Sequence, residues 1–325
     1  MRKCDHRFAD VLSYRGSRFR GTVRVSEVSV IDQSMNPWKR FWERGGFWRA
    51  LLLAAVYYGL YQLLGLLVGW MFGDVGSPAR GKEGGTMDVL IATALPIVLA
   101  VVLLMLFAAS LGWFKELFGP QPVRGRGWMW VAIAIVLSIN ISALLSIDYG
   151  KAGGSLVAAW LFTGLFIGLA EEMLTRGFVV NLMRKAGRGE IAVAMASAGI
   201  FAALHMGNLF TSDQGLVITL EQVVYTFFFG LCMYLALRVT GNLIWPVLLH
   251  ATTDPTLFLH GGDPVVNLFG LWAGFSTYII IITGVVLLIV FVVSEHRRAK
   301  QPELETSPTP RHHAGKHLQG PGAKA

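Results

Sequence analysis

The sequence predicts an all-α, polytopic membrane protein with about eight transmembrane helices. Of its 325 residues, 54% are hydrophobic and only 15% are charged, and the mean hydropathy is +0.54. Each helical crossing of a hydrocarbon core ~30 Å thick needs ~20 mostly apolar residues. The chain contains a succession of such apolar runs, separated by short polar segments.

These runs give the predicted helices in order along the chain. Five windows contain no charged residue: 51–72, 89–114, 127–147, 152–170 and 264–294. Three further apolar segments carry isolated polar groups: 190–208, 218–238 and 243–258. Glu221 lies within the second of these three, and the third is short for a complete crossing.

The lysines and arginines predict how the helices are oriented. The formal net charge of +8 first suggests a nucleic-acid partner. However, twenty-four Lys and Arg residues lie in the termini and in loops on one side of the predicted helices, and only three lie in the alternate loops. This is the positive-inside pattern. We therefore expect an integral protein of the lipid bilayer, with both termini in the cytoplasm and no nucleic-acid partner.

Composition divides the chain into five regions. Residues 1–46 form a basic cytoplasmic arm, and residues 297–325 form a polar cytoplasmic tail whose low hydrophobicity predicts disorder. Between them we expect three transmembrane helices in residues 47–152, a core containing the polar membrane residues in 153–260, and a C-terminal transmembrane helix in 261–296.

Ionisable side chains in membrane helices are costly and usually face a cavity or a partner, and six of those on the predicted helices are candidates for a site. Glu171 lies 16 residues before the turn expected near Gly187, and His205 lies 18 residues after it. At ~1.5 Å per residue the two share nearly the same depth on antiparallel helices. His250, nine residues beyond Gly241, reaches that depth if the Gly187 hairpin projects into the cytoplasm. The full set is Glu171, Glu172, Arg176, His205, His250 and Asp254.

Spacing within each helix predicts a coherent polar face. Residues four apart lie on one side of a helix and can interact; the pairs are Glu172–Arg176, Phe201–His205 and His250–Asp254. Glu171 is rotated ~100° from Glu172 and points elsewhere. The simplest alternative is that all of these groups only hold the helices together. We prefer that structural interpretation for Glu172 and Arg176. For the six residues as a whole, we expect a functional site.

The same residues carry a resemblance to a known family. Three segments resemble the EExxxR, FxxxH and HxxxN/D motifs of the CPBP family: EEMLTR (171–176), FAALH (201–205) and TGNLIWPVLLHATTD (240–254). This is the family of CAAX proteases and bacteriocin-processing enzymes, which are intramembrane endopeptidases. The match spans about 100 residues, and three motifs in this order on membrane helices are more specific than any one of them.

The resemblance implies a glutamate-dependent peptidase whose intramembrane cavity opens towards the cytoplasm. In such an enzyme Glu171 is the general base that activates water, assisted by His205. The chemistry suits this role, because an apolar cavity disfavours the charged form of a carboxylate and makes it a competent base near neutral pH. The implied substrate is a membrane-associated protein or peptide.

The remaining motif residues receive their roles from the same resemblance. His250 and Asp254 occupy the positions that stabilise the oxyanion, while Arg176, Glu172 and Phe201 support the site. Asp254 is a departure, because many members have Asn there, and an ionised aspartate cannot donate a hydrogen bond to an oxyanion. Either Asp254 is protonated, or it accepts a hydrogen bond from His250 and orients that ring. We prefer the second alternative.

Other mechanisms and functions stay open at this point. Two histidines and a glutamate could form an open catalytic zinc site, so a zinc metalloprotease is the alternative to a cofactor-free mechanism. The chain has no HExxH motif and its ligands would come from three helices, which favours the metal-free reaction.

A non-catalytic immunity or assembly factor on the same scaffold is the next alternative, and a proton-coupled transporter is the third. The Arg, Gly and Ala content indicates a bacterial plasma membrane.

Overall fold

The computed structural model describes residues 36–73, 85–212 and 214–300, and these ranges are helical apart from turns and one isolated β-bridge between Ile147 and Pro264. The all-α prediction is confirmed for this part of the chain. Most of the predicted N-terminal arm and the predicted tail from residue 301 lie outside the described residues.

Within the described residues, seven helices are long and apolar enough to cross a membrane, so the protein is an integral membrane protein. Several of these spans contain more than one helical element. The seven are α3 (Phe47–Phe72), α4–η2–α5 (Thr86–Asp88, Val89–Ala94, Leu95–Leu111), η3–α7 (Gly127–Met129, Trp130–Leu144), α9–η4–α10 (Gly154–Glu172, Met173–Val179, Val180–Lys185), α11–α12 (Glu190–His205, Asn208–Thr211), α13 (Leu216–Thr240) and α16 (Ser276–Lys300).

The remaining elements are shorter or more polar. They are α2 (Pro37–Glu43), α6 (Phe114–Phe118), α8 (Tyr149–Ala152), α14 (Ile244–Gly262) and α15 (Leu268–Gly274). The predicted segment 243–258 is therefore helical, as α14, but its His, Thr and Asp residues keep it out of the group of seven apolar spans. The predicted segment 264–294 is divided between α15 and α16.

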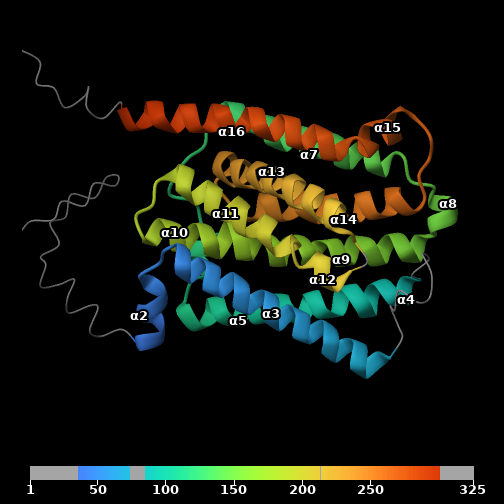
Figure 1. The fold of residues 1–325 in the computed structure, drawn as a ribbon, viewed down its shortest axis with the longest axis horizontal. Coiled ribbons are helices and arrows are strands. Elements are labelled where there is room, and N and C mark those ends of the chain that lie inside the picture. Colours follow the sequence, from blue (N-terminus) through green and yellow to red (C-terminus); the bar gives the residue numbers. More distant parts are fainter. Residues whose placement is uncertain (1–35, 74–84, 213, 301–325) are drawn as a thin grey trace, which may run out of the picture.

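The long helices form one antiparallel bundle. Figure 1 shows α3 and α5 along one side of the bundle, α7 and α16 along the other, and α9, α11, α13 and α14 between them. In this central group α14 packs along α9, and α11 packs along α13. Helix α2 and the C-terminal end of α16 lie at the same end of the bundle (Figure 1). The central group carries all three polar motifs.

Two glycines bring α9 and α14 unusually close. A Cβ atom on Gly168 would lie 2.7 Å from both the Ala251 nitrogen and the Val247 carbonyl oxygen, and one on Gly164 would lie 2.2 Å from Cγ of Pro255. Gly164 and Gly168 form a GxxxG pattern, which allows close backbone approach between membrane helices. This contact sets α14 directly beside the glutamates at the end of α9.

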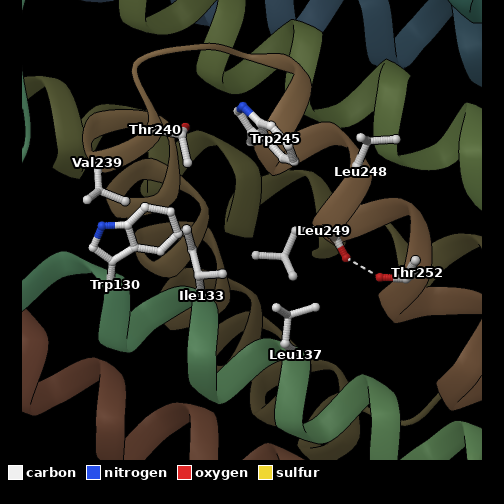
Figure 2. Close-up of a pocket in the computed structure, with 9 residues that line it drawn as sticks. All are labelled: Trp130, Ile133, Leu137, Val239, Thr240, Trp245, Leu248, Leu249 and Thr252. Carbon is white, nitrogen blue, oxygen red and sulfur yellow. Dashed lines mark hydrogen bonds between the residues drawn. The ribbon is translucent and has the colours of Figure 1, made fainter.

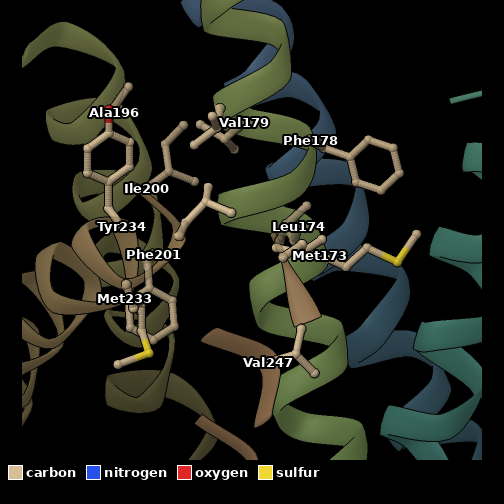
Figure 3. Packing of buried hydrophobic residues seen from close by; sticks show 14 of the residues in the cluster. Met173, Leu174, Phe178, Val179, Ala196, Ile200, Phe201, Met233, Tyr234 and Val247 are labelled. Atoms are coloured by element: carbon tan, nitrogen blue, oxygen red, sulfur yellow. The ribbon is translucent and has the colours of Figure 1, made fainter. Parts of the chain in front are cut away.

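The segment that follows these glutamates is packed into the apolar interior. Every residue of η4, Met173 to Val179, is buried. Figure 3 shows Val179 directed towards Ile200 on α11, while Phe178 points to the opposite side. Packing on both sides holds η4, and with it the adjacent glutamates, in one position within the bundle.

A network of ion pairs joins the helices at the end of the bundle where α10 finishes. Lys185 lies 2.5 Å from Oε2 of Glu43 and 2.8 Å from Oε2 of Glu116. Burial acts to raise the pKa of the Glu43 carboxyl, but hydrogen bonds donated by Lys185 and Trp113 outweigh burial and hold that pKa below its usual value. The network ties α2 and α6 to the helix that carries the EExxxR motif.

Candidate active site

Glu171 and Glu172 lie where α9 changes into the π-helical segment η4. π-Helical turns within α-helices occur often at functional sites, and the wider turn rotates the residues that follow. The two neighbouring side chains have different surroundings, since the Glu171 side chain is 25% exposed and the Glu172 side chain is fully buried. Glu171 is therefore the glutamate that a substrate or water can reach.

Glu172 and Arg176 form the ion pair that their spacing predicts. Nη1 of Arg176 lies 2.9 Å from Oε1 of Glu172, with both side chains inaccessible to solvent. The same nitrogen donates to Oγ1 of Thr175 at 2.6 Å, and the guanidinium lies 4.7 Å from the centre of the Phe201 ring. The pair is a buried structural element that also positions Phe201 against α9.

His250 lies among three carboxyl groups. Its Nδ1 atom is 2.8 Å from Oε1 of Glu172, while Nε2 is 3.5 Å from Oε2 of Glu171 and 3.7 Å from Oδ2 of Asp254. An ionised carboxylate only accepts hydrogen bonds, so Nδ1 donates its N–H to Glu172. That bond turns Nε2 towards Glu171 and Asp254. The imidazole itself is only 2% exposed.

The four predicted catalytic residues line one pocket of about 190 Å³. Glu171, His205, His250 and Asp254 all line it, together with Phe201. Glu172 and Arg176 do not line it, and Glu172 contacts His250 through Nδ1. The lining residues are Glu171, Phe201, His205, Gln222, Tyr225, Thr226, Phe229, His250, Asp254, Leu257 and Phe258. One chamber thus holds two carboxyl groups and two imidazoles among aromatic rings.

The orientation of His205 follows from its own helix. Its Nδ1 atom lies 3.0 Å from the carbonyl oxygen of Phe201, one turn earlier, and the two rings meet edge to face at 4.9 Å. A carbonyl oxygen only accepts, so Nδ1 carries the proton. In the neutral ring this leaves the lone pair on Nε2, which can accept a proton or a hydrogen bond from water.

Sequence reasoning missed the contribution of α13. Gln222 and Tyr225 line the pocket, and the Oε1 atom of Gln222 accepts a hydrogen bond from Nδ2 of Asn208 at 2.9 Å. The signal was available, because residues 222, 225 and 226 are polar or aromatic positions one turn apart in an otherwise apolar segment. Glu221, the charged residue that stands out there in the sequence, is exposed and outside the pocket.

Asn140 on α7 is a second residue that the motifs do not indicate. Its Nδ2 atom lies 3.3 Å from the carbonyl oxygen of Leu249, 2.9 Å from Oγ1 of Thr252 and 3.0 Å from Oγ1 of Thr253. The side chain is 2% exposed. These bonds hold the turn of α14 that contains His250.

In ranges 36–73, 85–212 and 214–300, no group of three His, Cys, Asp or Glu side chains is arranged to hold a metal ion.

Comparison with known proteins agrees with the resemblance carried by the motifs. Residues 153–256 match the family described as type II CAAX prenyl endopeptidase Rce1-like. The matched region begins before α9 and ends within α14, so it contains all the predicted site residues. No curated protein and no solved structure matches the chain significantly.

Proposed function

We propose that this chain, which carries a domain of the Rce1-like type II CAAX prenyl endopeptidase (CPBP) family in residues 153–256, is an intramembrane endopeptidase. It hydrolyses a peptide bond of a membrane-associated protein or peptide without a metal ion. The observation that carries the proposal is the pocket in which the half-buried Glu171 carboxylate faces Nε2 of a fixed His250. A base and a hydrogen-bond donor thereby lie 3.5 Å apart on the wall of one pocket of about 190 Å³, which a water molecule and a carbonyl group can enter.

In the proposed reaction Glu171 removes a proton from a water molecule. The resulting hydroxide attacks the scissile carbonyl carbon, whose oxygen becomes the oxyanion of a tetrahedral intermediate. Nε2 of His205 accepts a hydrogen bond from the attacking water and orients it. The C–N bond then breaks as the proton held by Glu171 passes to the leaving nitrogen. One water is consumed, and a carboxylic acid and an amine are formed.

His250 supplies the donor for the oxyanion. As an imidazolium, it donates Nδ1–H to Glu172 and Nε2–H to the developing negative charge. Arg176 keeps the charge of Glu172 balanced, so this glutamate can hold the ring throughout the reaction. Oδ2 of Asp254 lies 3.7 Å from Nε2, too far for a direct hydrogen bond, so in the resting site this carboxylate stabilises the charged ring by electrostatic attraction.

The orientation in the membrane is part of the proposal. Helix α2 and the C-terminal end of α16 share one end of the bundle (Figure 1), and the basic loops of the chain belong to that end. By the positive-inside rule this end faces the cytoplasm. We place both termini there, in the plasma membrane of a bacterium, and keep the five regions of the chain. The pocket lining extends away from this end, to Gln222 near the start of α13 and Phe258 near the end of α14, and so does not support the expected opening towards the cytoplasm.

A comparison of peptides between two cell lines tests the function. Cells that produce the wild-type chain should contain cleaved membrane or secreted peptides whose uncleaved precursors accumulate when the chain carries Glu171→Gln. Glu221→Gln is the matched control, since Glu221 is exposed on α13 and outside the pocket. Identical peptides in wild-type and Glu171→Gln cells would favour a non-catalytic role for the same scaffold.

A further inference from the structure

A second pocket, larger than the candidate active site, lies between α7, α13 and α14. Its volume is about 560 Å³, within the ~300–1,000 Å³ of ordinary ligand pockets. Figure 2 shows Trp130, Ile133 and Leu137 along α7, with Leu249 of α14 directed across the space towards Leu137. The lining residues are Trp130, Ile133, Leu137, Val239, Thr240, Trp245, Leu248, Leu249 and Thr252.

The lining is chemically suited to hydrocarbon. Its two hydroxyl groups are occupied within the protein: Thr240 donates to the carbonyl of Ala236 at 2.7 Å, and Thr252 donates to the carbonyl of Leu249 at 2.9 Å. The indole N–H groups of the two tryptophans are the other polar atoms of these side chains. A peptide in this space would bury backbone groups without enough partners, which is costly. An apolar chain meets no such cost.

The pocket is continuous with the lipid-facing surface. Trp130 is 53% exposed, Trp245 is 56% exposed and Leu248 is 45% exposed. Such large apolar side chains on the outside of a membrane bundle contact lipid chains. A hydrocarbon chain can therefore enter sideways from the bilayer.

Basic residues lie beside one wall of this pocket. The backbone N–H of Gly125 donates to the carbonyl of Arg238 at 2.7 Å, and the next residue, Val239, lines the pocket. Gly125 is flanked by Arg124 and Arg126, which are both exposed. Tryptophans are typical of the level of lipid headgroups, and exposed arginines at that level attract anionic lipid. The positive charge next to the apolar pocket thus complements the negative charge of a phosphate headgroup.

We propose that this pocket binds one anionic phospholipid of the surrounding bilayer, with an acyl chain between α7 and α14 and the phosphate near Arg124 and Arg126. The site is separate from the candidate active site, although both use α14. Leu249 and Thr252 face the lipid pocket, whereas His250 and Asp254 face the polar one. Lipid binding does not depend on the proposed peptidase activity.

Lipid titration of the purified, delipidated full-length protein tests the site. Native mass spectrometry would count bound dioleoyl phosphatidylglycerol, with dioleoyl phosphatidylcholine as the zwitterionic comparison. Leu137→Trp fills the pocket and should weaken phosphatidylglycerol binding about tenfold or more, because the acyl chain loses its buried contacts. Leu106→Trp is the matched control, since Leu106 is 61% exposed on α5 and outside the pocket; it should bind as the wild type does.

A second pair of variants tests the headgroup. Arg126→Gln should reduce the preference for phosphatidylglycerol over phosphatidylcholine several-fold, while Arg297→Gln, an exposed arginine on α16, should leave it unchanged. If Leu137→Trp does not fold, Leu248→Phe replaces it. Equal binding by wild type and the pocket-filling variant would overturn the proposal. Equal affinity for the two lipids would contradict the claim that the occupant is an anionic phospholipid. Displacement of phosphatidylglycerol by a lipid-modified peptide at equal concentration would contradict it as well.

Discussion

Nδ1 of His250 lies 2.8 Å from Oε1 of Glu172, and this same oxygen accepts a hydrogen bond from Arg176 at 2.9 Å. One buried carboxylate therefore connects the helix that carries both glutamates to the helix that carries His250. The contact directs Nε2 of His250 towards Glu171. The ion pair within α9–η4 and the orientation of the candidate oxyanion donor are thus one structural unit.

Loss of Arg176 should destabilise the whole protein. Arg176→Met breaks a buried ion pair and leaves Glu172 with His250 as its remaining partner; breaking a buried pair typically costs about 3–5 kcal/mol of the free energy of unfolding. Thermal or denaturant unfolding in detergent measures the loss. The double variant Glu172→Gln/Arg176→Met should recover part of it, because the buried carboxylate that lost Arg176 is gone. A cost below ~1 kcal/mol, as for an exposed ion pair, would contradict the structural role of this pair.

Gly168 should tolerate no side chain. Gly168→Ala places a Cβ atom 2.7 Å from the backbone of α14, so α14 must move away from α9 and carry His250 away from Glu171. A displacement of ~1 Å at a catalytic group can lower the rate ~100-fold, measured as kcat for peptide cleavage. Gly199→Ala is the control, since a Cβ atom on Gly199 would meet nothing within 4 Å. Similar cleavage rates for the two variants would refute the close-packing account.

His205 should act in catalysis and contribute little to folding. His205→Ala removes the group that orients water, and general acid–base groups typically contribute ~10²–10⁴-fold to the rate. His296→Ala is a matched control: its Nδ1 atom lies 2.8 Å from the carbonyl oxygen of Val292 one turn earlier, as Nδ1 of His205 does with Phe201, but it is exposed on α16. Cleavage by His205→Ala at the wild-type rate would remove this residue from the mechanism.

Asp254 should be replaceable by asparagine. The carbonyl oxygen of Asn keeps a polar acceptor beside His250, and its amide can donate to an oxyanion. We expect Asp254→Asn to keep kcat within about tenfold of wild type, or ~1.4 kcal/mol in barrier height, and Asp254→Ala to lose considerably more. If the Asn variant is as impaired as the Ala variant, the negative charge of Asp254 is what the site requires.

Much of the fold follows from local sequence signals. The apolar windows predict the spanning helices because hydrocarbon tolerates little else, and the four-residue spacing of Glu172 and Arg176 predicts their ion pair. Counting residues from Gly187 places Glu171 and His205 at one depth, and both line the same pocket. These predictions need only helix geometry and the thickness of a bilayer.

Features that depend on packing between helices could not be predicted in the same way. The sequence of 218–238 shows polar and aromatic positions at 222, 225 and 226, but not that this face of the helix lines the pocket. The π-helical turn after Glu172 belongs to a segment that packs against α11 and α3, and these contacts cannot be inferred from the sequence. The polar residues of α14 keep it below the hydropathy of a typical span, although it packs along α9 in the centre of the bundle. The GxxxG pattern at Gly164 and Gly168 can be recognised in the sequence, but the sequence does not show that it packs against α14.

The rate of peptide cleavage by purified Glu171→Gln, in a lipid bilayer and with a metal chelator present, tests the central claim most directly. The wild-type chain and the control Glu221→Gln should cleave the substrate at similar rates under these conditions. Glu171→Gln keeps the shape of the side chain but removes its basicity, so its rate should fall at least ~10²–10⁴-fold while its unfolding temperature stays near that of the wild type. Cleavage by Glu171→Gln at the wild-type rate would contradict the proposed mechanism.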